Sequence, residues 1–117
     1  MSKKKILVAD DSATIRLLLK KFLSEKYEVI EAENGRQTLK KFKKEMPVLL
    51  VLDLQMPIID GFSVCEAVKK DTDVPVIILT SMDEKFDKEW AGKQGADMYL
   101  KKPVNREQIL EAVEKYI

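Results

Sequence analysis

The sequence lacks histidine altogether and has one cysteine, Cys65, among its 117 residues. Because histidine is absent, any mechanism that needs an imidazole as a base, a metal ligand or a carrier group must take it from a partner. A single cysteine excludes an internal disulfide and is compatible with a reducing compartment. Near the N-terminus the apolar stretch covers only residues 6–9, which is too short for a signal peptide or a membrane span. We therefore expect a cytoplasmic protein without a membrane partner.

An excess of charge of one sign is also missing, because 21 Lys and Arg residues stand against 20 Asp and Glu and leave a net charge of +1. Opposite charges interleave and no predicted helix carries a one-sided basic stripe, so we predict no direct binding of nucleic acid. A composition of 45% hydrophobic and 35% charged residues is typical of an ordinary globular protein. The length fits a single domain over residues 1–117.

Short apolar runs alternate with helical patterns along the chain. Runs at residues 6–9, 28–32, 48–52, 76–79 and 98–100 predict five strands, and the first, third and fourth are almost continuously apolar, as is typical of parallel strands covered on both faces. Apolar residues at helical spacing predict a helix after each strand, with the stripes Ile15-Leu18-Leu19-Phe22-Leu23, Leu39-Phe42, Phe62-Cys65-Val68, Phe86-Trp90-Ala91 and Ile109-Val113-Tyr116-Ile117. This order predicts an α/β fold, a doubly wound five-stranded parallel sheet with helices on both faces.

Polar side chains follow four of the predicted strands. In chain order they are Asp10 and Asp11, then Asp53, then Thr80 and Ser81, then Lys101 and Lys102. Because ligands bind beyond the carboxyl ends of parallel strands, we expect these side chains to share one site at that edge of the sheet. Three converging carboxylates would repel one another by on the order of a few kcal/mol per close pair, and a hard cation such as Mg²⁺ would relieve that repulsion. A lysine and a hydroxyl suit phosphoryl oxygens, so the pattern predicts a metal-assisted phosphoryl site with an aspartate nucleophile.

Each of these residues alone could have an ordinary structural role. An aspartate after a strand is usually a turn residue or a helix N-cap, and Ser12 is an alternative cap for the first helix. Lys102 alone would be a solvated surface charge, and Thr80 a hydroxyl bonded to the backbone. Their joint occurrence at the ends of the appropriate strands favours the functional interpretation.

Four segments of the sequence resemble the receiver domain of bacterial two-component response regulators. They are VADDS at residues 8–12, LVLDLQMPIIDG at 50–61, ILTS at 78–81 and YLKKPV at 99–104. The resemblance covers the whole chain and implies a stand-alone receiver of the chemotaxis-regulator kind with no effector domain. It also implies a flavodoxin-like sheet with strand order 2-1-3-4-5.

The resemblance assigns a metal site and a phosphoacceptor. It implies that Asp11 holds Mg²⁺, that Asp10 acts mostly through water on the metal, and that Asp53 accepts the phosphoryl group. The backbone carbonyl of Gln55 would be the remaining ligand of the ion.

The resemblance also assigns the residues around the phosphoryl group. Lys102 would contact its oxygens and form a cis peptide bond with Pro103, while the Thr80 hydroxyl and a small neighbour, Ser81, would lie beside it. Tyr99 would be the aromatic residue that changes rotamer together with Thr80.

The implied activity is that of a switch, which catalyses its own loading from a partner's phosphohistidine and its own slow unloading. A histidine kinase or phosphotransfer protein would dock on the first helix, where Leu17 faces away from the predicted core. The downstream target would bind the fourth helix, the fifth strand and the fifth helix, at residues 83–117. Two alternatives stay open at this point: an aspartate-nucleophile phosphohydrolase, for which Gln55 stands where a second acid is needed, and an interaction module that is not phosphorylated.

Overall fold

The computed structural model describes residues 3–54, 56, 58–81 and 95–117. Five parallel strands form one sheet in the order β2-β1-β3-β4-β5, which confirms the predicted sheet and its order. The strands are β1 (Lys5–Ala9), β2 (Glu28–Ala32), β3 (Leu49–Asp53), β4 (Val76–Thr80) and β5 (Met98–Lys101). The described helices are α1 (Ala13–Leu23), α2 (Gly35–Glu45), α3 (Gly61–Asp71) and α5 (Arg106–Tyr116). The helix predicted around Phe86 and Trp90 lies outside the described residues.

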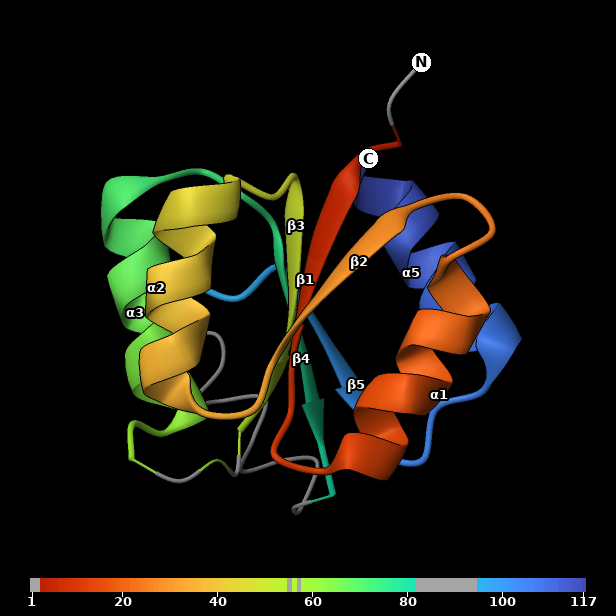
Figure 1. Cartoon of the computed structure of the whole chain (residues 1–117), viewed down its shortest axis with the longest axis horizontal. Helices are drawn as coiled ribbons and strands as arrows, with labels where there is room; N and C mark the ends of the chain where they lie inside the picture. The colour runs from red at the N-terminus through yellow and green to blue at the C-terminus, as the bar shows by residue number, and fades with distance from the viewer. Residues whose placement is uncertain (1–2, 55, 57, 82–94) are drawn as a thin grey trace.

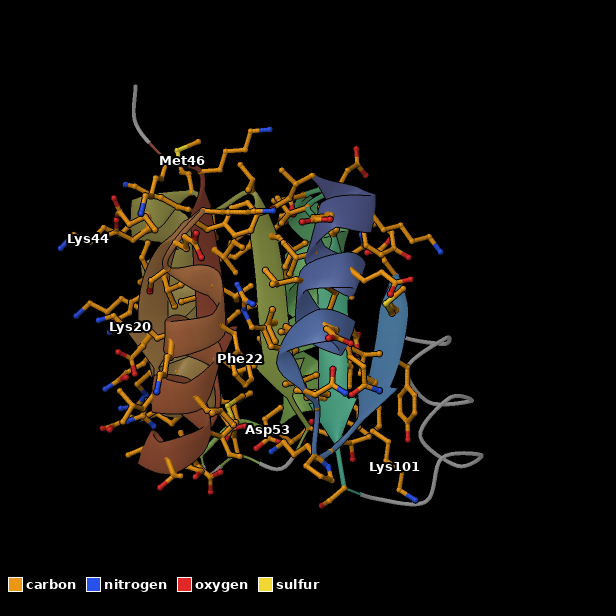
Figure 2. All side chains as sticks on the ribbon, turned by 90° about the vertical axis from the view of Figure 1, so that its right-hand side faces the viewer. Lys20, Phe22, Lys44, Met46, Asp53 and Lys101 are labelled. Carbon is orange, nitrogen blue, oxygen red and sulfur yellow. The ribbon has the colours of Figure 1, made fainter. Side chains whose placement is uncertain are left out.

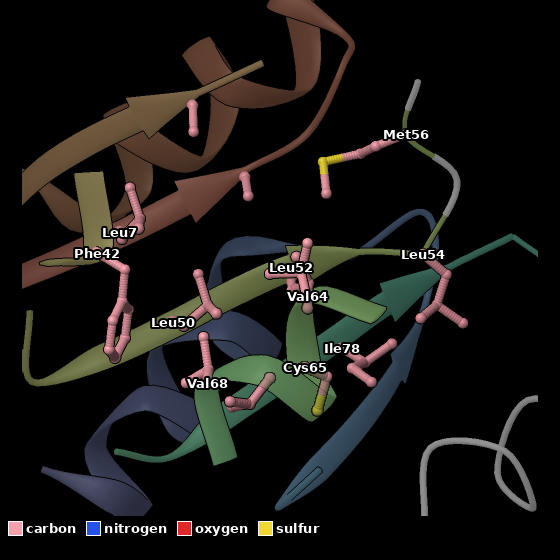
Figure 3. Packing of buried hydrophobic residues seen from close by; sticks show 13 residues of the cluster. Leu7, Phe42, Leu50, Leu52, Leu54, Met56, Val64, Cys65, Val68 and Ile78 are labelled. Carbon is pink, nitrogen blue, oxygen red and sulfur yellow. The ribbon is translucent and has the colours of Figure 1, made fainter. Parts of the chain in front are cut away.

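Helices cover both faces of the sheet, with α2 and α3 on one face and α1 and α5 on the other (Figure 1). Alternate residues of each central strand supply two separate cores, so that Leu50 packs under α2 and α3 while Val51 packs under α1 and α5. Figure 3 shows the first of these cores, in which Phe42 of α2 and Val68 of α3 lie over the strands. Burial on both faces explains why the central strands are apolar throughout.

Each of the four described helices begins with a side chain that caps its first turn. Ser12 accepts a hydrogen bond from the backbone N–H of Ile15 at 3.3 Å, so the cap of α1 is Ser12 and not one of the aspartates. Asn34, Asp60 and Asn105 cap the other three described helices in the same way. Since these helices follow strands directly, their N-termini lie at the carboxyl edge of the sheet, next to the predicted site.

The predictions are wrong in three respects: the ends of the strands, one core residue and the charge pattern of one helix. Strands β1, β4 and β5 each extend one residue beyond the predicted run, to Lys5, Thr80 and Lys101. Strand β3 covers residues 49–53 and not 48–52, because Asp53 still pairs in register with Leu79 of β4 whatever the polarity of its side chain. Leu18, placed in the core stripe of α1, is 39% exposed, because each residue turns a helix by about 100° and the buried line runs through the next residue, Leu19. Leu17 is 67% exposed, as expected.

The third error concerns charge. Helix α2 does carry a one-sided basic surface, because Thr38 and Phe42 turn its opposite side into the core and leave its cations in solvent. The exposed cations of α2 are Arg36, Lys40, Lys43 and Lys44.

Candidate functional site

Three carboxylates meet at the carboxyl edge of the sheet. Asp53 is the last residue of β3 and is 2% exposed, while Asp10 directly follows β1 and is 1% exposed. Asp11 is exposed to solvent beside them. One oxygen from each carboxylate lies within 4.8 Å of the other two. The structure therefore brings together the three acids that the sequence placed at the ends of two separate strands, and Figure 2 shows Asp53 at that end of the molecule.

Among the described residues, Lys102 supplies a positive charge close to these acids. Its Nζ lies 2.9 Å from Oδ2 of Asp10 and 3.2 Å from Oδ1 of Asp53. Burial lowers the pKa of Lys102, but the hydrogen bond to Asp10 and the charges of Asp53 and Asp10 outweigh that effect and raise the pKa above its ordinary value. The ammonium is therefore fully charged at neutral pH.

The loop after β5 fixes the position of Lys102. The backbone N–H of Lys102 donates to the carbonyl of Thr80 at 2.7 Å. The peptide bond between Lys102 and Pro103 is cis, as the resemblance implied.

The chemistry of the cluster fits a hard divalent cation. One ammonium cannot neutralise three carboxylates, and two of these are almost completely buried. Oδ1 of Asp10 accepts a hydrogen bond from the backbone N–H of Ser12 at 2.9 Å, whereas the buried Oδ2 has the Lys102 ammonium, 2.9 Å away, as its partner among the described residues. A set made only of oxygen donors with surplus negative charge is what Mg²⁺ or a similar ion binds.

Gly61 determines how closely the loop after β3 can return to the site. A Cβ at this position would lie 2.4 Å from the backbone oxygen of Asp53, so only glycine allows the approach. Its backbone N–H donates to the carbonyl of Leu54 at 3.0 Å, which closes the loop over the end of β3. Gln55, the proposed carbonyl ligand, lies in this loop but outside the described residues.

Arg16 of α1 ties the loop after β1 to the neighbouring strand, a role that the sequence did not indicate. Its Nη1 donates to the backbone carbonyl of Asp10 at 2.8 Å, and its Nε lies 3.2 Å from Oε1 of Glu31 on β2. Only 14% of its side chain is exposed. The sequence could have indicated that Arg16 is partly buried, because it lies between Ile15 and Leu19 on the helix. No spacing rule, however, connects it to Glu31.

The remaining predicted residues lie along β4 and β5. Thr80 is the last residue of β4 and is completely buried, and Ser81 is exposed just beyond it. Tyr99 on β5 pairs in register with Ile78 and packs partly buried against the core under α2 and α3. Because side chains alternate along a strand, Thr80 and Tyr99 lie on the same face of the sheet. Met82 and the rest of the segment that follows Ser81, up to residue 94, lie outside the described residues.

The fold and the site together define a class of protein: a doubly wound α/β domain with a cluster of three aspartates and a lysine at the carboxyl edge of its sheet. A family model described as the response regulator receiver domain matches residues 6–114. The chain belongs to this family, whose members are signalling switches of two-component systems.

Individual relatives agree with this membership. Protein PilH of Pseudomonas aeruginosa is 36% identical over 113 residues, which cover 93% of each chain. The probable transcriptional regulator ycf27 of Porphyridium aerugineum is 44% identical over 110 residues, which cover 93% of this chain but 46% of that protein. The chain thus spans just under half the length of the first curated relatives that it matches.

Solved structures extend the similarity to the whole fold. Chemotaxis protein CheY4 of Vibrio cholerae superposes with a TM-score of 0.92 at 30% identity and covers 99% of this chain and 100% of its own. A receiver domain protein from Clostridium thermocellum superposes with a TM-score of 0.90 at 32% identity. These matches confirm the flavodoxin-like fold. Within the ranges that the structure describes, no helix has the length and apolar character needed to cross a membrane.

Proposed function

We propose that this chain is a phosphoacceptor switch, in which Asp53 takes a phosphoryl group from the phosphohistidine of a histidine kinase or a phosphotransfer protein. The observation that carries the proposal is the burial of Asp53 within 3.2 Å of the Lys102 ammonium, at a site with surplus negative charge. The absence of histidine from the sequence fits a protein that receives the group and does not phosphorylate itself from a nucleotide. Residues 1–117 would act as one receiver domain in the cytoplasm.

In the transfer step, a carboxylate oxygen of Asp53 forms a bond to phosphorus while the phosphorus–nitrogen bond of the donor breaks. The leaving imidazole keeps the electron pair of that bond and takes up a proton from solvent. Lys102 offsets negative charge on the oxygens of the moving group, and the Thr80 hydroxyl donates a hydrogen bond to one of them. Attack of water on the acyl phosphate later releases inorganic phosphate and restores the carboxylate.

Mg²⁺ is the cofactor that suits this site. Asp11, Asp53 and the backbone carbonyl of Gln55 would hold it directly, and Asp10 indirectly. When bound, the ion supplies positive charge that offsets both the clustered carboxylates and the phosphoryl oxygens. Arg16 and Ser12 support the site from outside, because they hold the backbone and the carboxylate of Asp10 in place.

The phosphoryl group would carry nearly two negative charges in place of the single charge of the Asp53 carboxylate, and it would draw Thr80 and Lys102 toward it. Movement of Thr80 would leave space into which Tyr99 can turn, because both side chains lie on the same face of the sheet. This change would alter the region of residues 83–117, which includes β5 and α5, and there we place the binding site for the downstream protein. The kinase would dock on α1 with Leu17 as one contact.

Mass spectrometry tests the assignment of the acceptor. Incubation with acetyl phosphate and Mg²⁺ should add one phosphoryl group to the wild-type chain and none to Asp53→Asn. Asp73→Asn is the matched control, because Asp73 is an exposed aspartate that precedes the start of β4, whereas the site lies at the other end of that strand. Addition of the group to Asp53→Asn at the wild-type level would refute the proposal, and so would loss of the group from both variants alike.

A further inference from the structure

A groove of about 530 Å³ lies between α2 and α3, at the end of the molecule opposite to the carboxylates. Most of the described side chains that line it are apolar: Leu39, Phe42, Met46, Pro47, Val68 and Val74. Figure 2 shows the separation, with Met46 near one end of the molecule and Asp53 near the other. The groove therefore belongs neither to the metal site nor to the phosphoryl site.

Met46 stands at the mouth of this groove. It ends α2 as a C-cap residue in the left-handed conformation, with φ 50°, and is 79% exposed. Methionine is flexible and polarisable, so an exposed methionine beside an apolar groove is an adaptable contact for another apolar surface.

The rim of the groove along α2 is basic. Arg36, Lys40 and Lys43 follow one another at spacings of four and three residues, so they lie on one line along the helix, and Lys43 itself lines the groove. All three are exposed. The one acidic residue of α2, Glu45, pairs with Lys5 at 3.1 Å and so does not neutralise this line. The opposite wall, from α3, ends in Asp71 and Thr72.

We propose that this groove binds an amphipathic helix of a partner protein, with apolar anchors along one side and acidic residues along the flank that faces α2. Leu39 and Met46 are seven residues apart, which corresponds to about 10 Å along the helix axis. That length accommodates two or three anchors at positions i, i+3 or i+4, and i+7 of a bound helix. The line of cations on α2 complements acidic residues on the bound helix and sets its direction and register.

Nucleic acid fits this surface less well than a helix does. Phe42, the aromatic residue of the groove, is buried and so cannot stack on a base, and Asp71 on the far wall would repel phosphates. Lys43 is also the one cation among the described residues that line the groove, whereas affinity for nucleic acid comes mainly from cations that neutralise several phosphates.

A second copy of this chain also fits poorly. The exposed large hydrophobic residues that the structure describes elsewhere include Leu17 and Leu18 on α1, and these are accompanied by the cations Lys20 and Lys21 on the same helix. Bringing α1 of one copy to the groove of another would place lysines against the basic rim of α2. This arrangement is unfavourable, so we place the acidic residues on a different protein.

The test uses the full chain without phosphorylation, so its result does not depend on the function proposed above. The probe is a fluorescently labelled helical peptide of about 16 residues with leucines at i, i+3 and i+7 and glutamates along one flank. A peptide of the same composition with the leucines spread around the helix is the control probe. Anisotropy gives the affinity, and amide chemical shifts of the isotopically labelled chain give the location.

Matched charge reversals make the test specific. We expect Lys43→Glu to weaken binding of the probe by about threefold to tenfold, and Lys21→Glu on α1, which changes the net charge equally, to leave it unchanged. Met46→Asp should weaken binding by a similar factor, and its exposed position keeps the fold intact. The shifted amides should be those of α2 and α3.

Several outcomes would overturn the proposal. These are equal loss on both charge reversals, shifted amides on α1, equal binding of the two peptides, or no binding of the leucine-seamed peptide at all. Tighter binding of a single-stranded oligonucleotide that depends on Lys43 would assign the surface to nucleic acid instead. A concentration-dependent dimer that Met46→Asp abolishes would assign it to a second copy.

Discussion

Replacing Asp53 by asparagine should make the metal-free protein more stable. The substitution keeps the shape of the side chain and removes its charge from a site where Asp10 and Asp11 have carboxylate oxygens within 4.8 Å. At an effective dielectric constant of about 20, each of these repulsions is on the order of 3 kcal/mol, and the one toward exposed Asp11 is smaller because solvent screens it. The attraction to Lys102 at 3.2 Å is on the order of 5 kcal/mol on the same scale.

These Coulombic terms nearly cancel, so the cost of burying the charge decides the sign. A carboxylate that is 2% exposed loses almost all of its hydration, at an effective cost of several kcal/mol, whereas a neutral amide loses much less. We therefore expect the free energy of unfolding of Asp53→Asn to exceed that of the wild type by about 1–2 kcal/mol in the presence of a chelator. This corresponds to a rise of about 4–8 °C in the melting temperature.

Urea denaturation followed by circular dichroism measures the difference. Mg²⁺ should reduce it, because binding to the folded wild type at ten times the dissociation constant adds about 1.4 kcal/mol that the variant lacks in large part. Asp73→Asn, at an exposed site, is the control and should show no such dependence on the metal. If Asp53→Asn were less stable than the wild type in chelator, the carboxylates would be better compensated in the folded state than the geometry indicates, and the electrostatic argument for a cation would fail.

Two further variants probe the surroundings of the site. Arg16→Met should weaken Mg²⁺ binding in calorimetry by about threefold to tenfold, because the loop that carries Asp10 and Asp11 loses its link to Glu31. Lys21→Met on the same helix is the control and should have no effect. Equal effects of the two substitutions would contradict a positioning role for Arg16. Burial raises the pKa of the Cys65 thiol to about 11, while the charge of Lys69 lowers it and that of Asp97 raises it. The folded chain therefore keeps the thiol protonated at pH values where the unfolded chain, in which the pKa is 9.0, releases the proton. The contribution of the protonated thiol to the free energy of unfolding is complete below pH 9 and is lost between pH 9 and about 11. The stability of the wild type relative to Cys65→Ala should therefore fall by roughly 2 kcal/mol between pH 8 and 10.5. A difference that stays constant with pH would show that the thiol is not buried as described.

Much of the fold could be predicted because the central strands are covered on both faces. An unbroken apolar run such as residues 6–9 is too short for a buried helix and too apolar for a strand with one face in solvent, and alternation with helical patterns then implies parallel strands. The ends of the strands were less certain, because backbone pairing continues into polar residues: Asp53 and Thr80 are the last residues of β3 and β4 and not the first residues after them. Leu18 shows a similar uncertainty for helices. The five apolar residues of the predicted stripe cover more of the helix circumference than the core can bury, so one of them lies at the edge of the buried face.

The sequence could predict which residues lie at the site but not how they contact one another. Parallel strands bring their carboxyl ends to one edge, so Asp10, Asp53 and Lys102 had to lie near one another, but their burial and the two ion pairs of Lys102 depend on side-chain packing. Residues that act through the backbone leave no comparable signal. Gly61 matters because a side chain there would collide with the backbone oxygen of Asp53, which no spacing rule describes.

The basic surface of α2 was missed for a related reason. Net charge and interleaving along the sequence average over all directions around a helix, whereas a partner meets only the outward side. In α2 the core takes Thr38 and Phe42, and Glu45 is drawn to Lys5 on the first strand. What remains in solvent is a line of cations beside an apolar groove, on a chain whose net charge is only +1. A balanced composition therefore does not exclude a strongly polarised docking surface, and the direction of each side chain has to be known before the charge pattern can be interpreted.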